Sequence, residues 1–262
     1  DHQNNRQYDK AVNDWQEILK RTSNFDAAYV GIGKAYYRDG RWSDAMEYFK
    51  YAYDTANYSE AFKMYRKEWT SKYAIVVPIV AIAAIFGIVK LFGWASKVNK
   101  EATHMNGKKR TFKQEVLYAF YLLTHPFDGF WDLKHEKRGS VRGAIFFIVL
   151  TIATFYYQAI GQGYLLDPFA SLASVWGQIF GVLVPLFLFV LANWCLTTLF
   201  EGEGSFKNIF VACSYSLLPI PLLVIPTTIY SNFCITTETD IIGFISAFAF
   251  IWLGLLIFFG TM

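Results

Sequence analysis

The residues best suited to chemistry lie together in the stretch HPFDGFWDLKHEKRGS, from His125 to Ser140. Carboxylates and imidazoles are the groups that bind metal ions or transfer protons. The stretch holds five of them, namely His125, Asp128, Asp132, His135 and Glu136. It also carries a Trp, two Phe and a cluster of Lys and Arg. Two interpretations follow, a metal or catalytic site and a segment that lies against a membrane.

The helical spacing of this stretch favours the second interpretation. At about 100° per residue, a helix over 126–138 separates the apolar side chains from the polar ones. One face holds Pro126, Phe127, Phe130, Trp131 and Leu133, and the other holds Asp128, Asp132, His135 and Glu136. Aromatic residues flanked by Lys134, Lys137 and Arg138 are typical of a helix in the headgroup layer of an anionic membrane. We therefore expect Asp128, Trp131, Asp132 and His135 to form a cytoplasmic interfacial or partner-docking face, with no catalytic, metal or cofactor role.

The composition of the whole chain indicates a membrane protein. Of its 262 residues, 54% are hydrophobic and 19% are aromatic, whereas soluble domains are roughly 45–50% apolar. A membrane-spanning helix needs about 20 mainly apolar residues. Five stretches qualify, and they are 73–94, 143–166, 172–200, 206–230 and 241–262. The fourth contains Pro219, Pro221 and Pro226, so we expect this helix to kink or break.

The apolar stretches contain few groups that could act on a substrate. The last four hold no Asp, Glu, Arg or His, and such charges usually mark pumps and proton relays. Gln158, Gln162, Gln178 and Asn193 either form hydrogen bonds between helices or line a pathway for an uncharged solute. Cys195, Cys213 and Cys234 lack metal-binding spacing, and we expect Cys195 and Cys213 to be buried thiols. No nucleotide-binding or hydrolase motif occurs, and GEGSF at 202–206 is interpreted as a turn. The sequence therefore predicts a protein that is not an enzyme.

A helical repeat precedes the first apolar stretch. The segment AYVGIGKAYYRDGRWSDAMEYFKYA has the spacing of a tetratricopeptide repeat. Its packing residues include Tyr29, Gly33, Tyr36, Ala45 and Phe49. A shift by the repeat length of about 34 residues aligns Tyr8, Ala11 and Trp15 with Trp42, Ala45 and Phe49. Such repeats form binding scaffolds for a protein or a carbohydrate, and they bury their apolar faces only in arrays. We therefore expect further repeats, or another domain, before Asp1.

The distribution of basic residues orients the chain in the membrane. The loop 95–142 carries ten of the 24 Lys and Arg residues, whereas the short loops around Asp167 and Glu238 carry none. The positive-inside rule places the basic loop in the cytoplasm and the repeats outside it. Lys63, Arg66, Lys67 and Lys72, just before the first span, oppose this orientation. The expected segments are an extracytoplasmic repeat segment at 1–72, an anchor helix at 73–95, a basic cytoplasmic loop with interfacial helices at 96–142 and a bundle of four spans at 143–262.

From about Phe112 onward the chain resembles the YIP family, the polytopic membrane proteins of the Rab- or Ypt-interacting type. The resemblance rests on LLTHPFDGFWDLKHEKRGS and on FEGEGSFKNIFVACSYSLLPIPLLVIP, in which Tyr215 and Pro219 form a Tyr-x-x-x-Pro element. It implies five spans in this domain, so we expect a fifth after Met262. An exported repeat segment indicates the bacterial type, whose members accompany sugar importers of the ATP-binding-cassette class.

These observations predict an all-α protein of the cell membrane, with helical repeats followed by a transmembrane bundle. We interpret it as a non-enzymatic scaffold or accessory subunit that needs no cofactor. The resemblance implies importer permeases as membrane partners, and the repeats would bind an extracytoplasmic partner protein. The alternative is a stand-alone channel or transporter for an uncharged solute, with Gln158, Gln162, Gln178 and Asn193 along its pathway.

Overall fold

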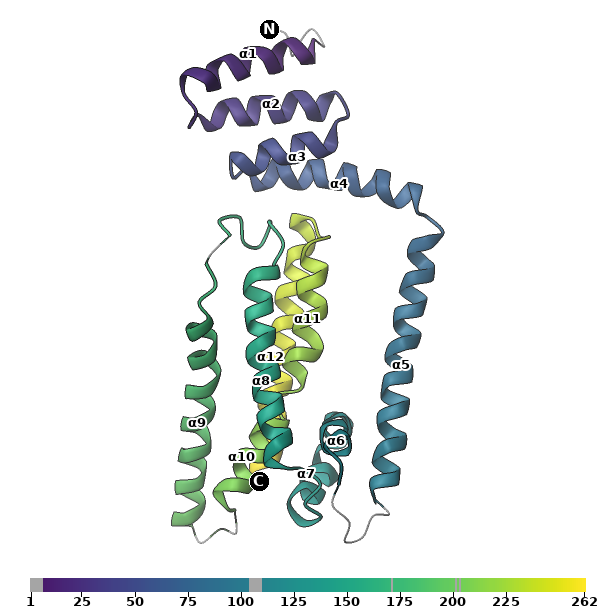
Figure 1. Ribbon diagram of the computed structural model, residues 1–262, viewed down its shortest axis with the longest axis vertical. Coiled ribbons are helices and arrows are strands. Elements are labelled where there is room, and N and C mark those ends of the chain that lie inside the picture. Colours follow the sequence, from purple (N-terminus) through teal and green to yellow (C-terminus); the bar gives the residue numbers. More distant parts are fainter. Residues whose placement is uncertain (1–6, 104–109, 171, 201, 203) are drawn as a thin grey trace. The chain divides into compact units, whose positions relative to one another are not determined.

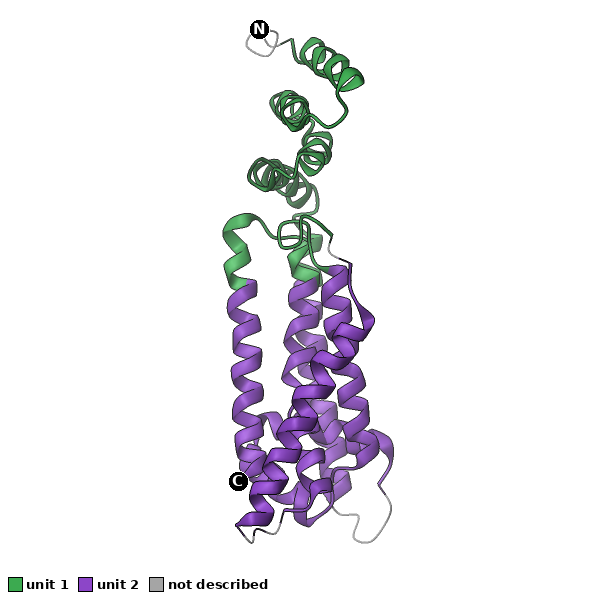
Figure 2. Cartoon of the chain, turned by 90° about the vertical axis from the view of Figure 1, so that its left-hand side faces the viewer, with its two compact units in different colours: residues 1–80, 162–171, 229–241 green, residues 81–161, 172–228, 242–262 purple. Residues whose placement is uncertain are grey.

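The computed structural model describes residues 7–103, 110–170, 172–200, 202 and 204–262 (Figure 1). Within these ranges every regular element is helical and no strand occurs, which confirms the all-α prediction. The chain divides into two compact units (Figure 2). Unit 1 comprises residues 1–80, 162–171 and 229–241, and unit 2 comprises 81–161, 172–228 and 242–262. Lys108, Lys109, Glu201 and Glu203, which entered the charge and turn arguments, lie outside the described residues.

Unit 1 begins with four consecutive helices, each packed against the next. They are α1 (Tyr8–Arg21), α2 (Asp26–Arg38), α3 (Trp42–Tyr51) and α4 (Thr55–Lys72). Two glycines of α2 receive aromatic rings from its neighbours. A Cβ atom on Gly31 would lie 2.5 Å from the Trp15 ring of α1, and one on Gly33 would lie 2.6 Å from the Phe49 ring of α3. Trp15 and Phe49, which the shift by the repeat length aligns, thus pack in a similar way, because each ring fills the space beside a glycine of α2.

Unit 2 contains most of the apolar helices. They are α5 (Val76–Thr103), α6 (Phe112–Thr124), α7 (Pro126–His135), α8 (Val141–Gly161), α9 (Val175–Leu199), α10 (Phe206–Tyr215), α11 (Pro219–Ser231) and α12 (Thr239–Thr261). The start of α5, the end of α11 and the start of α12 belong to unit 1, and so does the short 3-10 helix η1 (Thr236–Glu238). The main core of unit 2 joins α6, α7, α8, α10 and α12 through buried residues that include Tyr118, Leu122, Phe147, Tyr215 and Leu256.

Five helical segments of the described chain are long and apolar enough to cross a membrane, as predicted. The helix boundaries differ most from the apolar stretches at the end of α5 and at both ends of α8. Helix α5 continues to Thr103 because Ala95 and Val98 on its last turns pack against Leu117 of α6. Helix α8 begins at Val141, so Arg142 lies in its first turn, and it ends at Gly161.

The fourth span breaks between α10 and α11, as its prolines predict. Pro219 is the first residue of α11, where its missing N–H leaves no helical hydrogen bond unmade. This broken span is also the most enclosed, because 72% of its most apolar window is buried, against 11% for α9. It therefore forms the centre of the bundle, and α9 turns most of its surface outward.

The prediction that Cys195 and Cys213 are both buried is correct only for Cys213. Cys195 lies on an exposed side of α9. An apolar sequence does not distinguish a side chain packed in protein from one that faces lipid, because both environments exclude water. The three thiols are free in this structure.

Candidate functional site

The stretch that contains the predicted site forms α7 and the turn that follows it. Pro126 opens the helix at a position where proline is favoured. The predicted apolar face is divided between two environments. Phe130 and Leu133 are buried, whereas Phe127 and Trp131 are 69% and 59% exposed. One part of this face thus packs on the bundle, and the other part is open to lipid or to a partner.

The polar residues of α7 do not converge on one point. Asp128 is exposed, and His135 stacks on Trp131 at 4.4 Å and bonds through Nδ1 to the Trp131 carbonyl oxygen. The His125 ring instead stacks on Tyr121 of α6. Asp132 is half-buried, so it does not share the open face expected for it. Among the described residues, no group of three or more His, Cys, Asp or Glu side chains could hold a metal ion.

Arg138 differs from the expectation of a basic side chain that contacts lipid headgroups, because the protein itself buries it. Its Nη2 atom donates to the Asn99 carbonyl oxygen at 2.9 Å and to Thr103 Oγ1 at 2.7 Å. Its guanidinium lies 4.9 Å from the Tyr118 ring centre. Two carboxylates approach it at 3.8 Å, those of Asp132 and Glu136. We call these six residues the Arg138 network, and it joins the end of α5 to α6 and α7.

Burial governs the acid–base behaviour of this network. Desolvation, followed by the nearby Glu136 carboxylate, raises the pKa of Asp132, although Arg138 opposes the shift. Burial also raises the pKa of Tyr118, and the Asp132 charge adds to this effect. The Tyr118 hydroxyl donates to the Gly129 carbonyl oxygen at 2.7 Å. The Tyr118 hydroxyl therefore stays protonated, and its hydrogen bond links α6 to α7.

Arg110 fixes the turn after α7. Its Nη1 atom donates to the carbonyl oxygens of Glu136 at 2.6 Å and Lys137 at 2.9 Å. Carbonyl groups at the end of a helix have no partner within that helix, and a guanidinium satisfies them well. Lys137 adopts a left-handed backbone conformation with φ of 51°, which residues other than glycine rarely adopt. The turn is thus held in a strained conformation by a side chain from outside it.

A second network centres on Glu115 of α6. Its carboxylate accepts hydrogen bonds from Ser140 Oγ at 2.5 Å and from Arg142 Nη2 at 2.9 Å. Ser140 Oγ also accepts from the Gly143 N–H at 3.0 Å, so it caps the N-terminus of α8. The Tyr215 hydroxyl of α10 accepts from the Ser140 N–H at 3.3 Å. We call Glu115, Ser140, Arg142, Gly143 and Tyr215 the Glu115 network.

This network brings together the two sequence segments that carry the family resemblance. Ser140 closes the first segment, and Tyr215 belongs to the Tyr-x-x-x-Pro element of the second. Gly143 makes their approach possible, because a Cβ atom there would lie 2.8 Å from Tyr215 Cζ and still closer to its hydroxyl oxygen. Pro219 lies one turn further along, at the start of α11.

Neither network has the arrangement of a catalytic site. The Ser140 hydroxyl caps a helix, and both carboxylate oxygens of Glu115 already have donors. Glu115, Asn99 and Arg110 were not identified from the sequence. Glu115 offered one signal, since it interrupts the apolar helical pattern of FKQEVLYAF with an acid that the fold then buries.

A separate cluster lies within unit 1, where α4 contacts the segments 162–171 and 229–241 of the same unit. The Arg66 guanidinium forms two hydrogen bonds to the Glu238 carboxylate, at 2.7 and 2.8 Å, and one to the Phe233 carbonyl oxygen at 2.8 Å. The Thr236 N–H donates to Ser59 Oγ at 2.9 Å. We call this set, together with the aromatic contacts below, the loop clamp.

Aromatic rings extend the loop clamp to the second loop. Tyr58 of α4 is buried and meets the Tyr164 ring edge-on at 4.6 Å. Tyr53 stacks on Phe169 at 5.0 Å. Burial raises the pKa of Tyr58 to about 12, so its hydroxyl stays protonated. Both loops, 162–171 and 229–241, are thus bound to the last helices of the repeat segment.

The predicted packing residues of the repeat have two kinds of surroundings. Ala45 and Phe49 are buried, and Gly33 lies under the Phe49 ring. Tyr29 and Tyr36 are only half-buried. They join a cluster of tyrosines, in which Tyr29 lies 5.6 Å from Tyr51 and Tyr36 lies 5.5 Å from Tyr48.

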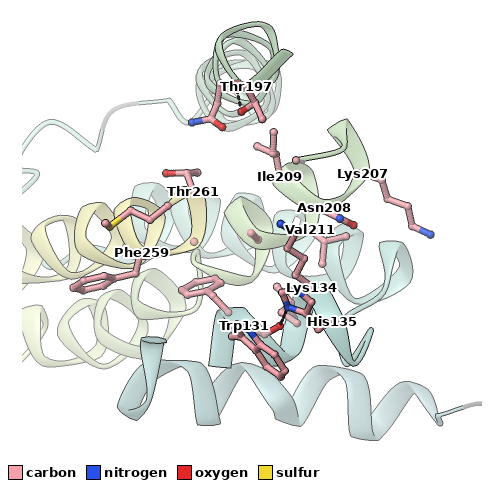
Figure 3. Close-up of a pocket in the computed structure, with 18 of the residues that line it drawn as sticks. Trp131, Lys134, His135, Thr197, Lys207, Asn208, Ile209, Val211, Phe259 and Thr261 are labelled. Carbon is pink, nitrogen blue, oxygen red and sulfur yellow. Dashed lines mark hydrogen bonds between the residues drawn. The ribbon is translucent and has the colours of Figure 1, made fainter. Parts of the chain in front are cut away.

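The polar residues of the alternative pathway, Gln158, Gln162, Gln178 and Asn193, are half-buried. A cavity of about 580 Å³ at one end of unit 2 includes Asn193 in its lining (Figure 3). A second, of about 400 Å³, is lined by apolar residues from α8, α9 and α10. Gln158, Gln162 and Gln178 line neither of these two cavities.

Comparison with known proteins places these features in a family. The Yip1 domain family matches residues 120–262, which is more than half of the chain. The matched range contains α7, the Tyr215 element and the last four spans. No curated protein and no solved structure matches the chain. The chain therefore belongs to the Yip1 domain family and is a multi-pass integral membrane protein.

Proposed function

We propose that this protein is a non-enzymatic scaffold or accessory subunit of a membrane complex, with its repeats as the partner-binding part. The observation that carries the proposal is the loop clamp. Arg66, Tyr58 and Ser59 of α4 are bound to both loops of unit 1. A two-point attachment of this kind orders the last repeat helices against the two loops of unit 1, and an ordered surface is what a docking platform requires.

The connectivity supports an extracytoplasmic position for the repeats. If all five candidate spans cross the membrane, the repeats share a side with loops 162–171 and 229–241, which carry no Lys or Arg, and the basic loop 95–142 lies on the other side. Arg66 belongs to the basic group that opposed this orientation. Because its guanidinium is paired with Glu238, it no longer acts as a free positive charge beside the membrane. The conflict between the two signals is thereby reduced.

The tyrosine cluster is the surface of the repeats best suited to a partner. Tyr29, Tyr48 and Tyr51 contact one another, and Tyr51 is 54% exposed. Tyrosine supplies a large contact area at a low entropic cost and is enriched in binding hot spots. We propose a protein partner for this surface, in line with the scaffold role.

Within the membrane, the partners that the family resemblance suggests are permeases of sugar importers. Helix α5 supports a membrane partner because none of its most apolar window is buried. The buried charges support a non-enzymatic role, since Glu115 and Arg138 are bound to other groups of the protein itself.

Mild-detergent purification with quantitative mass spectrometry tests this proposal. We expect stoichiometric partner proteins. The partner of the repeats should be lost when Tyr29, Tyr48 and Tyr51 are changed to Ser, and retained when exposed Glu60 is changed to Gln. A protein that purifies alone and transports an uncharged solute in liposomes would establish the transporter alternative. Orientation is tested separately in a variant lacking Cys195. A membrane-impermeant maleimide should label Ser23→Cys and not Lys100→Cys in intact cells, and the opposite pattern would overturn the topology.

A further inference from the structure

The cavity of about 580 Å³ in unit 2 is lined by both basic and apolar residues. Four elements bound it, and Figure 3 shows Lys134 and His135 on α7, Thr197 on α9, Lys207 and Asn208 on α10 and Phe259 and Thr261 on α12. Lys137 adds a third ammonium group to its lining. From this arrangement we propose that the cavity binds an anionic phospholipid, with the phosphate among the lysines and an acyl chain against the apolar wall.

The position of the cavity along the spans fits a lipid of one leaflet. Helix α9 ends at Leu199, α10 begins at Phe206 and α12 ends at Thr261. These three helix ends reach the same surface of the membrane, and the cavity lies beside them. Asn193 lies six residues before the end of α9, which corresponds to a depth of roughly 9 Å at 1.5 Å per residue. The lining thus runs from headgroup level into the hydrocarbon region.

The charge of the lining complements a phosphodiester. Three lysines are among the described residues that line it. The nearby carboxylates of Asp132 and Glu136 are not part of the lining and lie 3.8 Å from Arg138. Basic pockets between transmembrane helices on the basic-loop side are a recognised way to bind anionic headgroups.

The apolar part of the lining complements an acyl chain. Phe130, Ile209 and Val211 form it with Phe259, and Phe127 and Trp131 beside them are largely exposed. Trp131 is suited to the boundary itself, because its ring is apolar and its N–H can reach water or a headgroup. This assignment explains why α7 leaves two large aromatic side chains uncovered.

Binding is measured with the purified full chain in detergent, with bromine-labelled phosphatidylglycerol as the probe and phosphatidylcholine with the same labelled chains as the reference. Bromine quenches nearby tryptophan, so the fluorescence component that is absent from Trp131→Phe reports occupancy of the cavity. We expect the Trp131 component to be quenched at lower concentrations of the anionic lipid. Each of Lys137→Gln and Lys207→Gln should weaken this binding roughly fivefold, from about 1 kcal/mol per basic residue near a membrane surface.

Lys100→Gln is the matched control, because Lys100 is exposed on the same side of the membrane and does not line the cavity. It should leave binding unchanged. Equal quenching by the two lipids, or equal effects of the three lysine variants, would overturn the proposal. Inorganic phosphate is added as a competitor. If it displaces the lipid at low millimolar concentration, the cavity is a site for free phosphate and the lipid assignment is wrong.

Discussion

The contact between Gly143 and Tyr215 gives the sharpest test of how the family element holds the bundle together. In a helix, changing Gly to Ala normally stabilises by about 0.5–1 kcal/mol, because alanine has less backbone freedom to lose. At Gly143 the added Cβ atom would lie 2.8 Å from Tyr215 Cζ and closer still to its hydroxyl oxygen. Overpacking of a filled site costs about 1–3 kcal/mol. We therefore expect Gly143→Ala to destabilise the fold by about 2 kcal/mol.

A double-mutant cycle assigns this cost to the Tyr215 hydroxyl. Tyr215→Phe alone should cost about 1 kcal/mol, because the Ser140 N–H loses its acceptor. It also removes the atom that the new Cβ would meet first. The double variant should therefore lose less than the sum of the two single variants, by about 1 kcal/mol. The relief is partial because the Tyr215 ring itself remains within 2.8 Å.

The free energy of unfolding is measured in mixed micelles of a mild detergent and dodecyl sulfate, with tryptophan fluorescence as the signal. Gly254→Ala on α12 is the matched control, since a Cβ atom there would have no neighbour within 4 Å. It should therefore stabilise the protein by about 0.5–1 kcal/mol, as is usual for this change in a helix. Additive effects of Gly143→Ala and Tyr215→Phe, or a stabilisation by Gly143→Ala like that of the control, would refute the proposed contact.

Three further predictions concern the loop clamp, the Arg138 network and the turn after α7. Arg66→Gln should destabilise unit 1 by about 1 kcal/mol through loss of its two bonds to Glu238 and speed hydrogen exchange in 229–241, while Arg21→Gln, whose ion pair is exposed, should leave exchange there unchanged. Because the pKa of Asp132 is raised in the folded state, the folded protein holds this proton more tightly than the unfolded chain does. The protein therefore loses stability as the pH rises past 3.8, the ordinary pKa of an Asp carboxyl. The melting temperature of Asp132→Asn relative to the parent should accordingly increase from about pH 4 to pH 7, and a constant difference would contradict the shift. Lys137→Gly should raise stability by up to about 1 kcal/mol, because glycine adopts the left-handed backbone without strain. The same variant should bind the anionic lipid more weakly than the parent protein. A variant that binds the lipid as tightly as the parent would count against the cavity assignment.

The sequence was most informative where one pattern determines one structure. Runs of about 20 apolar residues have few alternatives to a membrane helix, so all five spans were predicted. The prolines at 219, 221 and 226 predicted the break in the fourth span for an equally local reason. The family resemblance covered the range that the Yip1 domain family matches.

The sequence was least informative about polar residues that meet only in the folded chain. The sequence predicts that Arg138 contacts lipid headgroups, because its neighbours in sequence are basic and aromatic. Its partners, Asn99 and Thr103, come from the end of another helix, and that proximity leaves no local pattern. The same holds for Arg66 and Glu238, which are far apart along the chain. Charge counts treat such residues as free, and only the fold shows which of them are paired.

The two sides of α7 have complementary roles, and this links the polar networks to the cavity. Arg110 holds the carbonyl oxygen of Lys137, and Arg138 binds the helix from the side of α5 and α6. The lysine side chain, by contrast, lines the cavity. A binding site gains affinity when its groups are already ordered, because less entropy is lost on association. The strained backbone of Lys137 is therefore explained if the turn serves to hold an ammonium group at the cavity rim, since glycine would fit the backbone better but would supply no charge.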